Sequence, residues 1–196
     1  NYKFKKVGHL GTLDPLAKGV LPIAVGEATK SIKFISNLKK RYSFVIKWGE
    51  ETDTCDLEGE VVEKSNVRPN FEKVKMVVSK FFIGSIEQTP PIYSAVKVNG
   101  IRAYKLARNK KNVKLKKKLI HIYKLTVKKP SNKNFCNFDI ICSRGTYIRS
   151  IARDLARKLG TVGFAHEIVR TEDNIFKIEN SISLLKVLDL SYADLE

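Results

Sequence analysis

The sequence predicts one α+β domain in which helices flank a mixed, mostly antiparallel sheet. Two hydrophobic periods alternate along the 196 residues: some segments repeat apolar side chains every second residue, as strands do, and others every three or four residues, as helices do. These segments lack the regular strand–helix–strand spacing of a parallel sheet. No internal repeat or Gly/Ser-rich linker divides the chain, and 43% hydrophobic residues are enough for one core. We therefore expect residues 1–196 to form a single domain.

Three segments have the period of strands. Residues 41–49 (RYSFVIKWG) place their aromatic residues and Ile46 on one face, and Gly49 ends the run. The same alternation recurs in FCNFDIIC at 135–142 and, less regularly, in KLIHIYKLTV at 118–127. The sequence therefore predicts strands in these three places.

Three other segments have the period of helices. The apolar residues of segment 26–40 recur at helical spacing, as do those of segment 71–82 and those that follow the turn SRGT at 143–146. Gly160 is the expected end of the third helix. The predicted core-facing residues are, in chain order, Ala28, Ile32, Ile35 and Leu38; Phe71, Val74, Val78 and Phe81; and Ile148, Ile151, Ala152, Leu155 and Leu159.

The segment GHLGTLDPLAKGVLP at 8–22 has neither period and contains one acid, Asp14. Its glycines permit unusual backbone angles, and Pro15 favours an extended conformation at Asp14, so we expect an ordered loop. An Asp-Pro pair in such a loop is usually a turn former whose side chain bonds local amides. Five aliphatic neighbours are more than a solvated turn needs, and they indicate a carboxylate in a pocket wall: Leu10, Leu13, Leu16, Val20 and Leu21.

The charge of the chain favours a polyanionic partner. Lys and Arg total 37 against 20 Asp and Glu, a net charge of +17. A lysine-rich proteome is the alternative source of this excess. Within the run 108–118 every charged residue is basic, and such a run is expected to contact RNA phosphates without reading sequence. Its cations are Arg108, Lys110, Lys111, Lys114, Lys116, Lys117 and Lys118.

Several classes of protein are disfavoured. No apolar run approaches the roughly 20 residues of a membrane helix, and the N-terminus lacks the layout of a signal peptide. Cys55, Cys136 and Cys142 are an odd number without CxxC spacing, and no His/Cys cluster has the arrangement of a zinc site. We expect no membrane contact, no metal and a reducing, cytoplasmic compartment.

Four ordered segments resemble the TruB-type tRNA pseudouridine synthases (tRNA pseudouridine-55 synthases). They are GHLGTLDPLAKGVLPIAVGEATK at 8–30, KRYSFVIKWGEETDTCDLEGEVV at 40–62, IEQTPPIYSAVKVNGIRAYKLAR at 86–108 and CSRGTYIRSIARDLARKLG at 142–160. The resemblance implies the pseudouridine synthase fold with a basic RNA-binding loop insertion. It further implies isomerisation of the T-loop uridine at position 55, with the tRNA T-arm as partner, no cofactor and a monomer. Two features of the family are expected to be absent from this chain: the N-terminal Lys-Pro strand and a C-terminal RNA-binding domain of PUA type.

The resemblance also assigns site residues. Asp14 matches the nucleophile, and Arg149 matches the arginine that pairs with it. The residues that match substrate-contacting positions are His9, Tyr42, Tyr147, Ile168 and Lys97. On the residues alone, Tyr42 and Ile168 would suit a core equally well, His9 is more often a surface or core residue, and Lys97 could be a plain phosphate contact.

Two further expectations follow from these assignments. Aliphatic walls disfavour the charged form of Asp14, and a guanidinium opposes that effect, so we predict an Arg149–Asp14 ion pair at roughly 2.7–3.2 Å. Attack at C6 of the base or at C1′ of the ribose cannot be distinguished from sequence. The alternative function is a non-catalytic tRNA-binding or tRNA-folding module that keeps the same surface.

Overall fold

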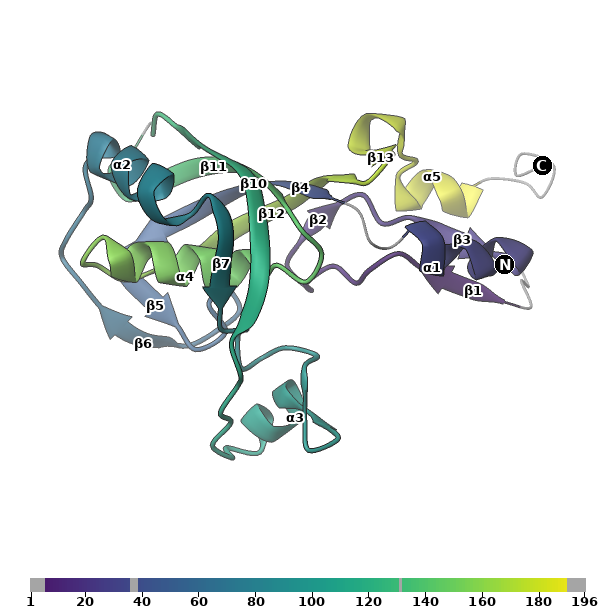
Figure 1. The fold of residues 1–196 in the computed structure, drawn as a ribbon, viewed down its shortest axis with the longest axis horizontal. Helices are drawn as coiled ribbons and strands as arrows, with labels where there is room; N and C mark the ends of the chain where they lie inside the picture. Colours follow the sequence, from purple (N-terminus) through teal and green to yellow (C-terminus); the bar gives the residue numbers. More distant parts are fainter. Residues whose placement is uncertain (1–5, 36–38, 131, 190–196) are drawn as a thin grey trace.

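The computed structural model describes residues 6–35, 39–130 and 132–189, and its centre is one mixed, mostly antiparallel sheet (Figure 1). Neighbouring strands run in the order β13-β12-β4-β11-β10-β7, and β2 joins the sheet by parallel pairing with β12. All the other pairs are antiparallel. This confirms the predicted fold class. The bounds are β2 (Lys18–Gly19), β4 (Lys40–Trp48), β7 (Gly84–Gln88), β10 (Lys118–Lys128), β11 (Phe135–Cys142), β12 (Gly163–Asp173) and β13 (Phe176–Lys177).

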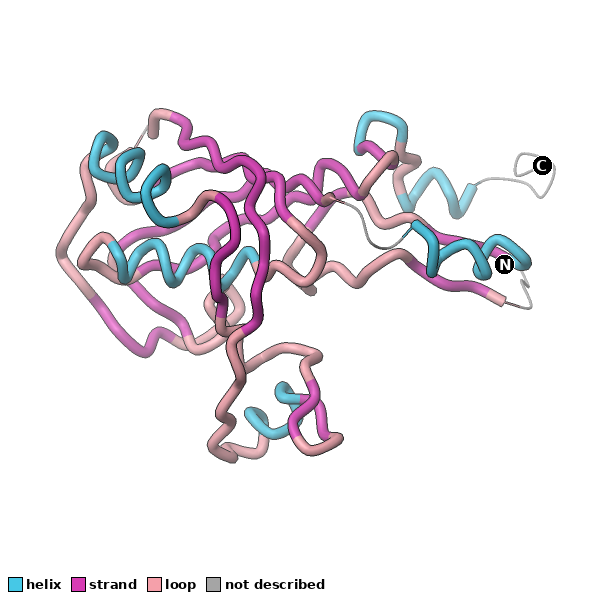
Figure 2. The backbone as a smooth tube through the Cα atoms, in the orientation of Figure 1, coloured by secondary structure: helices cyan, strands magenta, loops and turns pink. Residues whose placement is uncertain are grey.

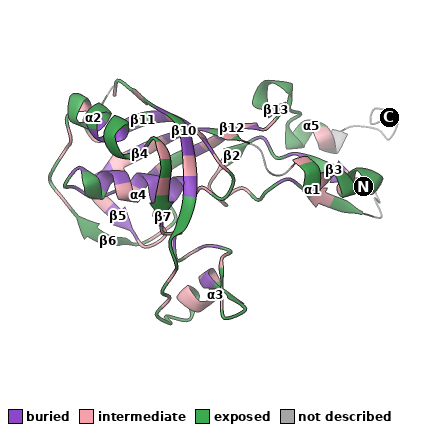
Figure 3. Cartoon of the chain, in the orientation of Figure 1, coloured by how far each residue is buried: buried purple, intermediate pink, exposed green. Residues whose placement is uncertain are grey.

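The core lies on one face of this sheet, under the helices α2 (Phe71–Phe81) and α4 (Ile148–Lys158) (Figure 3). Alternate residues of β4 and β11 point into it, as their period predicted. The Phe44 and Phe138 rings stack at 5.0 Å between centroids, and Trp48 meets Phe138 edge-on at 6.4 Å. The central strands therefore carry the largest buried side chains.

Both long helices have identifiable ends. The side chain of Asn70 accepts a hydrogen bond from the Lys73 amide at 2.8 Å, which caps the start of α2. After α4 the chain turns at Gly160, whose φ of +78° suits the glycine expected there. The apolar face predicted for α4 is buried. Neither helix, nor any other among the described residues, has the length and apolar character needed to cross a membrane.

Two expectations for the core are wrong. Within segment 26–40, residues 26–35 form a 3₁₀ helix, η1 (Gly26–Ser31), and one α-helical turn, α1 (Ile32–Ile35), with no buried residue in either. Ala28 is exposed, and Leu38 lies outside the described residues. Residues 26–35 pack beside the small sheet of β1 (Val7–His9) and β3 (Ile23–Val25), away from the main sheet, with Ile32 over Gly8. Such a small sheet cannot bury a helix face. In α2, Phe81 is 39% exposed because the helix ends there, and Phe82 enters the core instead.

The remaining elements extend from the main sheet (Figures 1 and 2). A hairpin of β8 (Lys97–Val98) and β9 (Ile101–Arg102) with α3 (Ala103–Arg108) forms an appendage between β7 and β10. The segments β5 and β6 form a two-stranded sheet beside α4. The other bounds are β5 (Glu50–Thr52), β6 (Val61–Lys64), η2 (Ile178–Asn180) and α5 (Leu184–Asp189).

Candidate active site

A cavity opens where the Asp14 loop, the centre of the sheet, the start of α4 and the α3 appendage meet. The loop contributes residues 10–15 and Ala17 to the lining of the cavity. The strands β4 and β12 supply the floor of the cavity, and residues 144–149 supply one wall. As predicted, the Asp14 loop lacks regular structure between β1 and β2. Of the five aliphatic neighbours of Asp14, Leu10 and Val20 are buried, whereas Leu21 is exposed.

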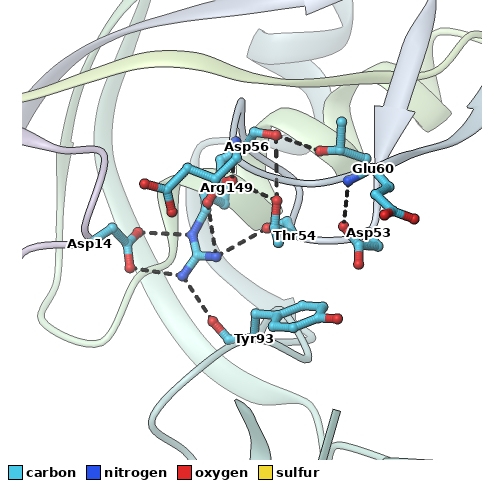
Figure 4. A network of polar contacts seen from close by, with 9 residues as sticks. Asp14, Asp53, Thr54, Asp56, Glu60, Tyr93 and Arg149 are labelled. Atoms are coloured by element: carbon cyan, nitrogen blue, oxygen red, sulfur yellow. Dashed lines mark hydrogen bonds and ion pairs between the residues drawn. The ribbon is translucent and has the colours of Figure 1, made fainter. Parts of the chain in front are cut away.

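Asp14 and Arg149 form the predicted ion pair (Figure 4). Arg149 donates from Nε to Oδ2 of Asp14 at 3.0 Å and from Nη2 to Oδ1 at 2.8 Å. Two parallel bonds of this kind fix the plane of the carboxylate as well as its charge. The side chain of Arg149 is 5% exposed and that of Asp14 is 26% exposed. The pair therefore presents its carboxylate to the cavity and keeps its guanidinium behind it.

A second carboxylate, Asp56, holds the other side of Arg149. Its Oδ2 lies 3.2 Å from Nη1, and its side chain is 3% exposed. Burial opposes the charge of Arg149, but the carboxylates of Asp14 and Asp56 outweigh that effect and raise the pKa of Arg149 above its ordinary value. Nη1 also donates to the Thr54 carbonyl at 3.0 Å, and Nη2 to the Tyr93 carbonyl at 3.2 Å. The guanidinium is thus held from several sides in one orientation.

The turn after β5 fixes Asp56. Thr54 Oγ1 donates to Asp56 Oδ1 at 2.6 Å, and the Glu58 amide donates to the same oxygen at 3.0 Å. Cys55, between them, has a φ of +60°, a conformation that non-glycine residues seldom adopt outside functional turns. Our reading of the sequence missed Asp56. The available signal was the acid-rich run ETDTCD at 51–56 in a strongly basic chain.

Three of the predicted substrate-contacting residues line the cavity with Asp14 and Arg149: Tyr42, Tyr147 and Ile168. Tyr42 and Ile168 are buried on β4 and β12, and Tyr147 precedes α4. Burial raises the pKa of both tyrosines, against a lowering effect of Arg170 on Tyr42. Both phenols are therefore neutral at physiological pH. They offer apolar ring surfaces beside the carboxylate.

Gln88, also missed, fixes the backbone of Tyr147. Its Nε2 donates to the Tyr147 carbonyl at 3.1 Å, and its Oε1 accepts from the Tyr147 amide at 2.8 Å. Gln88 is 2% exposed and ends β7. This reciprocal pair connects the strand before the α3 appendage to the residue before α4. A lone glutamine at the end of a strand carries no sequence signal for such a role.

The other predicted site residues do not line the cavity, with one exception. His9 is exposed on β1, and Lys97 is exposed on β8. Of the basic run, only Arg108 contributes to the lining, with its guanidinium 5.5 Å from the centre of the Tyr104 ring. Lys117 pairs with Glu87 at 3.2 Å on the surface. All seven cations of the run are exposed. Among the described residues, no group of three or more His, Cys, Asp or Glu side chains is arranged to hold a metal ion.

Comparison with known protein families shows which family has this sequence. Residues 1–148 match the model of the TruB family pseudouridylate synthase (N terminal domain). The chain belongs to the TruB family. The resemblance seen in the sequence is thereby confirmed.

The curated relatives described below share one name, tRNA pseudouridine synthase B. The chain is 44% identical to tRNA pseudouridine synthase B of Ehrlichia ruminantium (strain Gardel) over 94% of its own length and 63% of the relative's. It is 50% identical to tRNA pseudouridine synthase B of Rhodospirillum rubrum over 91% of its own length and 58% of the relative's. The chain therefore spans about three fifths of the length of these TruB-family relatives.

Solved structures agree on the fold. The chain resembles a protein in a crystal structure of a Cbf5-Nop10-Gar1 complex with a TM-score of 0.72 and 27% identity, over 98% of this chain and 48% of that one. A second match, in a structure of an H/ACA RNP bound to a substrate RNA containing 2′-deoxyuridine, has a TM-score of 0.67 at 23% identity, over 95% of this chain and 44% of that one. The TruB-family chain thus shares its arrangement of strands and helices with these proteins.

Proposed function

We propose that this chain converts a uridine of tRNA, the T-loop uridine at position 55, to pseudouridine, with Asp14 as the nucleophile. The observation that carries the proposal is the bidentate Arg149–Asp14 pair, which presents one carboxylate to a cavity whose lining includes Tyr42 and Tyr147. Membership of the TruB family and the names of the curated relatives support the reaction. The residues 1–196 act in this proposal as one catalytic domain, monomeric and cytoplasmic.

The reaction exchanges one bond of the nucleotide for another. The N1–C1′ bond breaks, the uracil turns, a C5–C1′ bond forms, the proton on C5 leaves to solvent, and N1 takes up a proton from solvent. A carboxylate can attack the flipped nucleotide, hold one fragment while the base turns, and then depart. Attack at C6 or at C1′ would use the carboxylate of Asp14. Neither route requires a cofactor.

Each neighbour of Asp14 has a role in this scheme. Arg149 orients the carboxylate through two hydrogen bonds, and Asp56 holds Arg149 from behind. Tyr42 and Tyr147 offer ring faces to the flipped uracil, and stacking on an aromatic ring offsets about 1–3 kcal/mol of the cost of extruding a base. Ile168 closes the apolar floor.

Residues outside the cavity act on the rest of the tRNA. We assign displacement of the uridine from the T-loop stack to His9, an RNA contact to Lys97, and contacts with the T-arm backbone to the cations of the run 108–118. The exposure of all these side chains supports the assignment, because phosphate contacts require accessible cations.

Tritium release from an unmodified tRNA transcript labelled at C5 of uridine tests the proposal. Asp14→Asn keeps the shape of the side chain but removes the anionic attacker, so turnover is expected to fall to background while tRNA binding stays within about 3-fold. Glu58→Gln is the matched control, because Glu58 is an exposed carboxylate that lines the same cavity. Its turnover is expected to stay near that of the parent.

Substantial product from Asp14→Asn would remove Asp14 from the mechanism. If the parent chain binds tRNA but releases no tritium, the non-catalytic tRNA-binding module is the correct reading instead.

A further inference from the structure

A second group of buried charges lies where the two ends of the Asp14 loop meet β4 and β12, and two of its members, Lys40 and Arg170, also belong to the cavity lining. It consists of Lys40 on β4 and of Arg170 and Asp173 on β12, whose side chains are 12%, 1% and 6% exposed. Asp173 Oδ2 pairs with Lys40 Nζ and lies 3.5 Å from Arg170 Nη1. Buried charges are costly unless they are paired and hydrogen-bonded, so the remaining donors of these cations indicate what the group is for.

Donors of both cations go to the two ends of the loop that carries Asp14. Arg170 donates from Nε to the Val20 carbonyl at 2.8 Å and from Nη2 to the Gly11 carbonyl at 3.1 Å. Lys40 Nζ donates to the Leu10 carbonyl at 3.4 Å. The backbone carbonyl of Arg170 accepts from the Val20 amide at 2.9 Å. One arginine therefore joins the entry and the exit of the loop.

Two glycines of the loop allow Lys40 and the backbone of Arg170 to approach it closely. A Cβ at Gly19 would lie 2.1 Å from the Arg170 carbonyl oxygen, and a Cβ at Gly11 would lie 3.1 Å from Lys40 Nζ. Both glycines also have positive φ, +107° and +90°. A side chain at Gly19 would push the loop away from β12. Glycine is needed there for close approach.

A β-bulge in β12 brings the charges to one side. Residues three apart on a regular strand face opposite sides of the sheet. Arg170 pairs with Tyr42 and Asp173 with Lys40, so three steps on β12 match two on β4, and the shift falls between Arg170 and Glu172. The extra residue turns Arg170 and Asp173 to the same face as Lys40 and Tyr42. The neighbouring cross-strand pair, Arg41 with Glu172, is exposed instead.

We propose that Lys40, Arg170 and Asp173 are positioning residues that hold residues 10–20 at both ends and thereby set Asp14 against Arg149 and the bound nucleotide. The inference rests on the proposed function of Asp14. The three residues act through the backbone of the loop, so their loss affects the chemical step more than the affinity for tRNA. A misplacement of about 1 Å at a reacting group can cost roughly 100-fold in rate.

Arg170→Lys tests the proposal. The variant keeps the charge and a partner for Asp173, but one ammonium cannot hold the Gly11 and Val20 carbonyls together. The single-turnover rate at saturating enzyme is expected to fall by about 100-fold, with the Kd for tRNA within about 3-fold of the parent. Arg41→Lys is the matched control on the neighbouring exposed pair, and its rate is expected to stay near that of the parent.

Hydrogen exchange supplies a readout that is independent of activity. In the parent, the Leu10 amide donates to the Pro22 carbonyl, the Ala17 amide to the Asp14 carbonyl and the Val20 amide to the Arg170 carbonyl. Arg170→Lys is expected to speed exchange in the peptide 10–22 by at least about 10-fold, whereas exchange in α4 stays unchanged.

A second variant covers the case in which Arg170→Lys fails to fold. Burial lowers the pKa of Lys40, although Asp173 opposes the shift, so Lys40→Gln removes a costly charge and leaves the Arg170–Asp173 pair intact. It releases the Leu10 carbonyl and removes the ion pair between Lys40 and Asp173. Its single-turnover rate is expected to fall by about 10-fold, with faster exchange confined to the same peptide.

The outcomes separate this inference from the proposed function. Parental exchange and parental rates in the folded variants overturn the positioning role. A loss in Kd as large as the loss in rate also overturns it, because it would show direct contact with tRNA. If exchange in the peptide 10–22 rises but Asp14→Asn remains active, the loop is held as proposed and the assignment of Asp14 as nucleophile fails.

Discussion

Arg149 shows how one side chain can combine a structural and an electrostatic task. Its Nε and both terminal nitrogens donate to two carboxylates and two backbone carbonyls that come from distant parts of the chain. A planar guanidinium with five N–H donors suits this arrangement, whereas an ammonium presents three donors from a single point. The orientation of Asp14 and the contacts among these distant segments therefore depend on the same group.

Arg149→Lys is expected to reduce the single-turnover rate by about 100-fold, because the lysine keeps a positive charge but loses the two-point contact that orients Asp14. The rate with saturating enzyme measures this loss. Arg157→Lys is the control: Arg157 makes the same kind of two-point contact, with Glu51, on the same helix but away from the cavity. Equal, small losses in both variants would show that the fork geometry at Arg149 is unimportant.

The cysteine thiols are expected to resist modification in the folded chain. Burial raises the pKa of Cys136 to about 11 and that of Cys142 to about 12, from an ordinary value of 9.0, and it also raises the pKa of Cys55. At pH 8 a shift of two pKa units leaves about 100-fold less thiolate at Cys136. A disulfide reagent such as DTNB should label none of the three at pH 8 and all three in denaturant.

The direction of the cysteine pKa shifts also predicts how the stability of the fold depends on pH. A pKa raised by folding means that the folded state favours the neutral thiols of Cys136 and Cys142. This contribution to stability is fully present below about pH 9 and is lost as the pH rises through the folded pKa values. Labelling should therefore accelerate only above that range, and rapid labelling of the folded chain at pH 8 would contradict the burial of these thiols.

Among the elements, the segment from α3 to the start of β10 has the highest density of positive charge. Its cations lie on the surface, and Arg108 is the member that reaches the cavity. The segment between α3 and β10 has no regular structure, so backbone interactions do not impose a helix or strand on its lysines. Its location links the cavity lining to an exposed basic surface, as a T-arm contact would require.

Replacement of Lys114, Lys116, Lys117 and Lys118 by Gln is expected to weaken tRNA binding and to flatten its salt dependence, by about 0.7–0.9 in log–log slope for each lost phosphate contact. Binding titrations at several salt concentrations measure the slope. The rate on bound tRNA should change much less. The control removes the same charge from β6 and α2, through Gln at Lys64, Lys73, Lys75 and Lys80. If the run 108–118 is only solvated, the two quadruple variants will show the same salt dependence of tRNA binding.

At the scale of the whole molecule, stability depends on the aromatic centre of the sheet. Phe138 is fully buried on β11, stacked on Phe44 and in edge contact with Trp48. The adjoining strand β4 and the next strand beyond it, β12, carry the floor of the cavity. Packing around Phe138 therefore supports the site as well as the fold.

Phe138→Ala is expected to lower the free energy of unfolding by about 3–5 kcal/mol, because it removes a large buried side chain and leaves a cavity. Urea unfolding monitored by circular dichroism measures the change. Phe34→Ala removes the same ring from α1, where Phe34 is 75% exposed, and should cost less than about 0.5 kcal/mol. Similar losses in the two variants would contradict the assignment of the core.

Local periodicity predicted the elements of this chain better than the places where they pack. The alternation in β4 and β11 and the helical face of α4 were correct, because burial on one side of an element leaves a pattern in neighbouring residues. At 26–40 the helical period was partly correct, because residues 26–35 form η1 and α1, but the expected burial of their apolar side chains was wrong. The small β1–β3 sheet beside them offers too little surface to bury a face.

The sequence by itself determined three of the strands, the long helices, the isolated carboxylate and, through the resemblance, its pairing with Arg149. Only the tertiary structure decided which further side chains meet them: Asp56 behind Arg149, Gln88 beneath Tyr147, and Asp173 with Lys40, 133 residues away. The physical reason is that such contacts depend on the order and register of the sheet. A single bulge in β12, invisible in the pattern of the strand, turns Asp173 from one face to the other and so places it against Lys40 and Arg170.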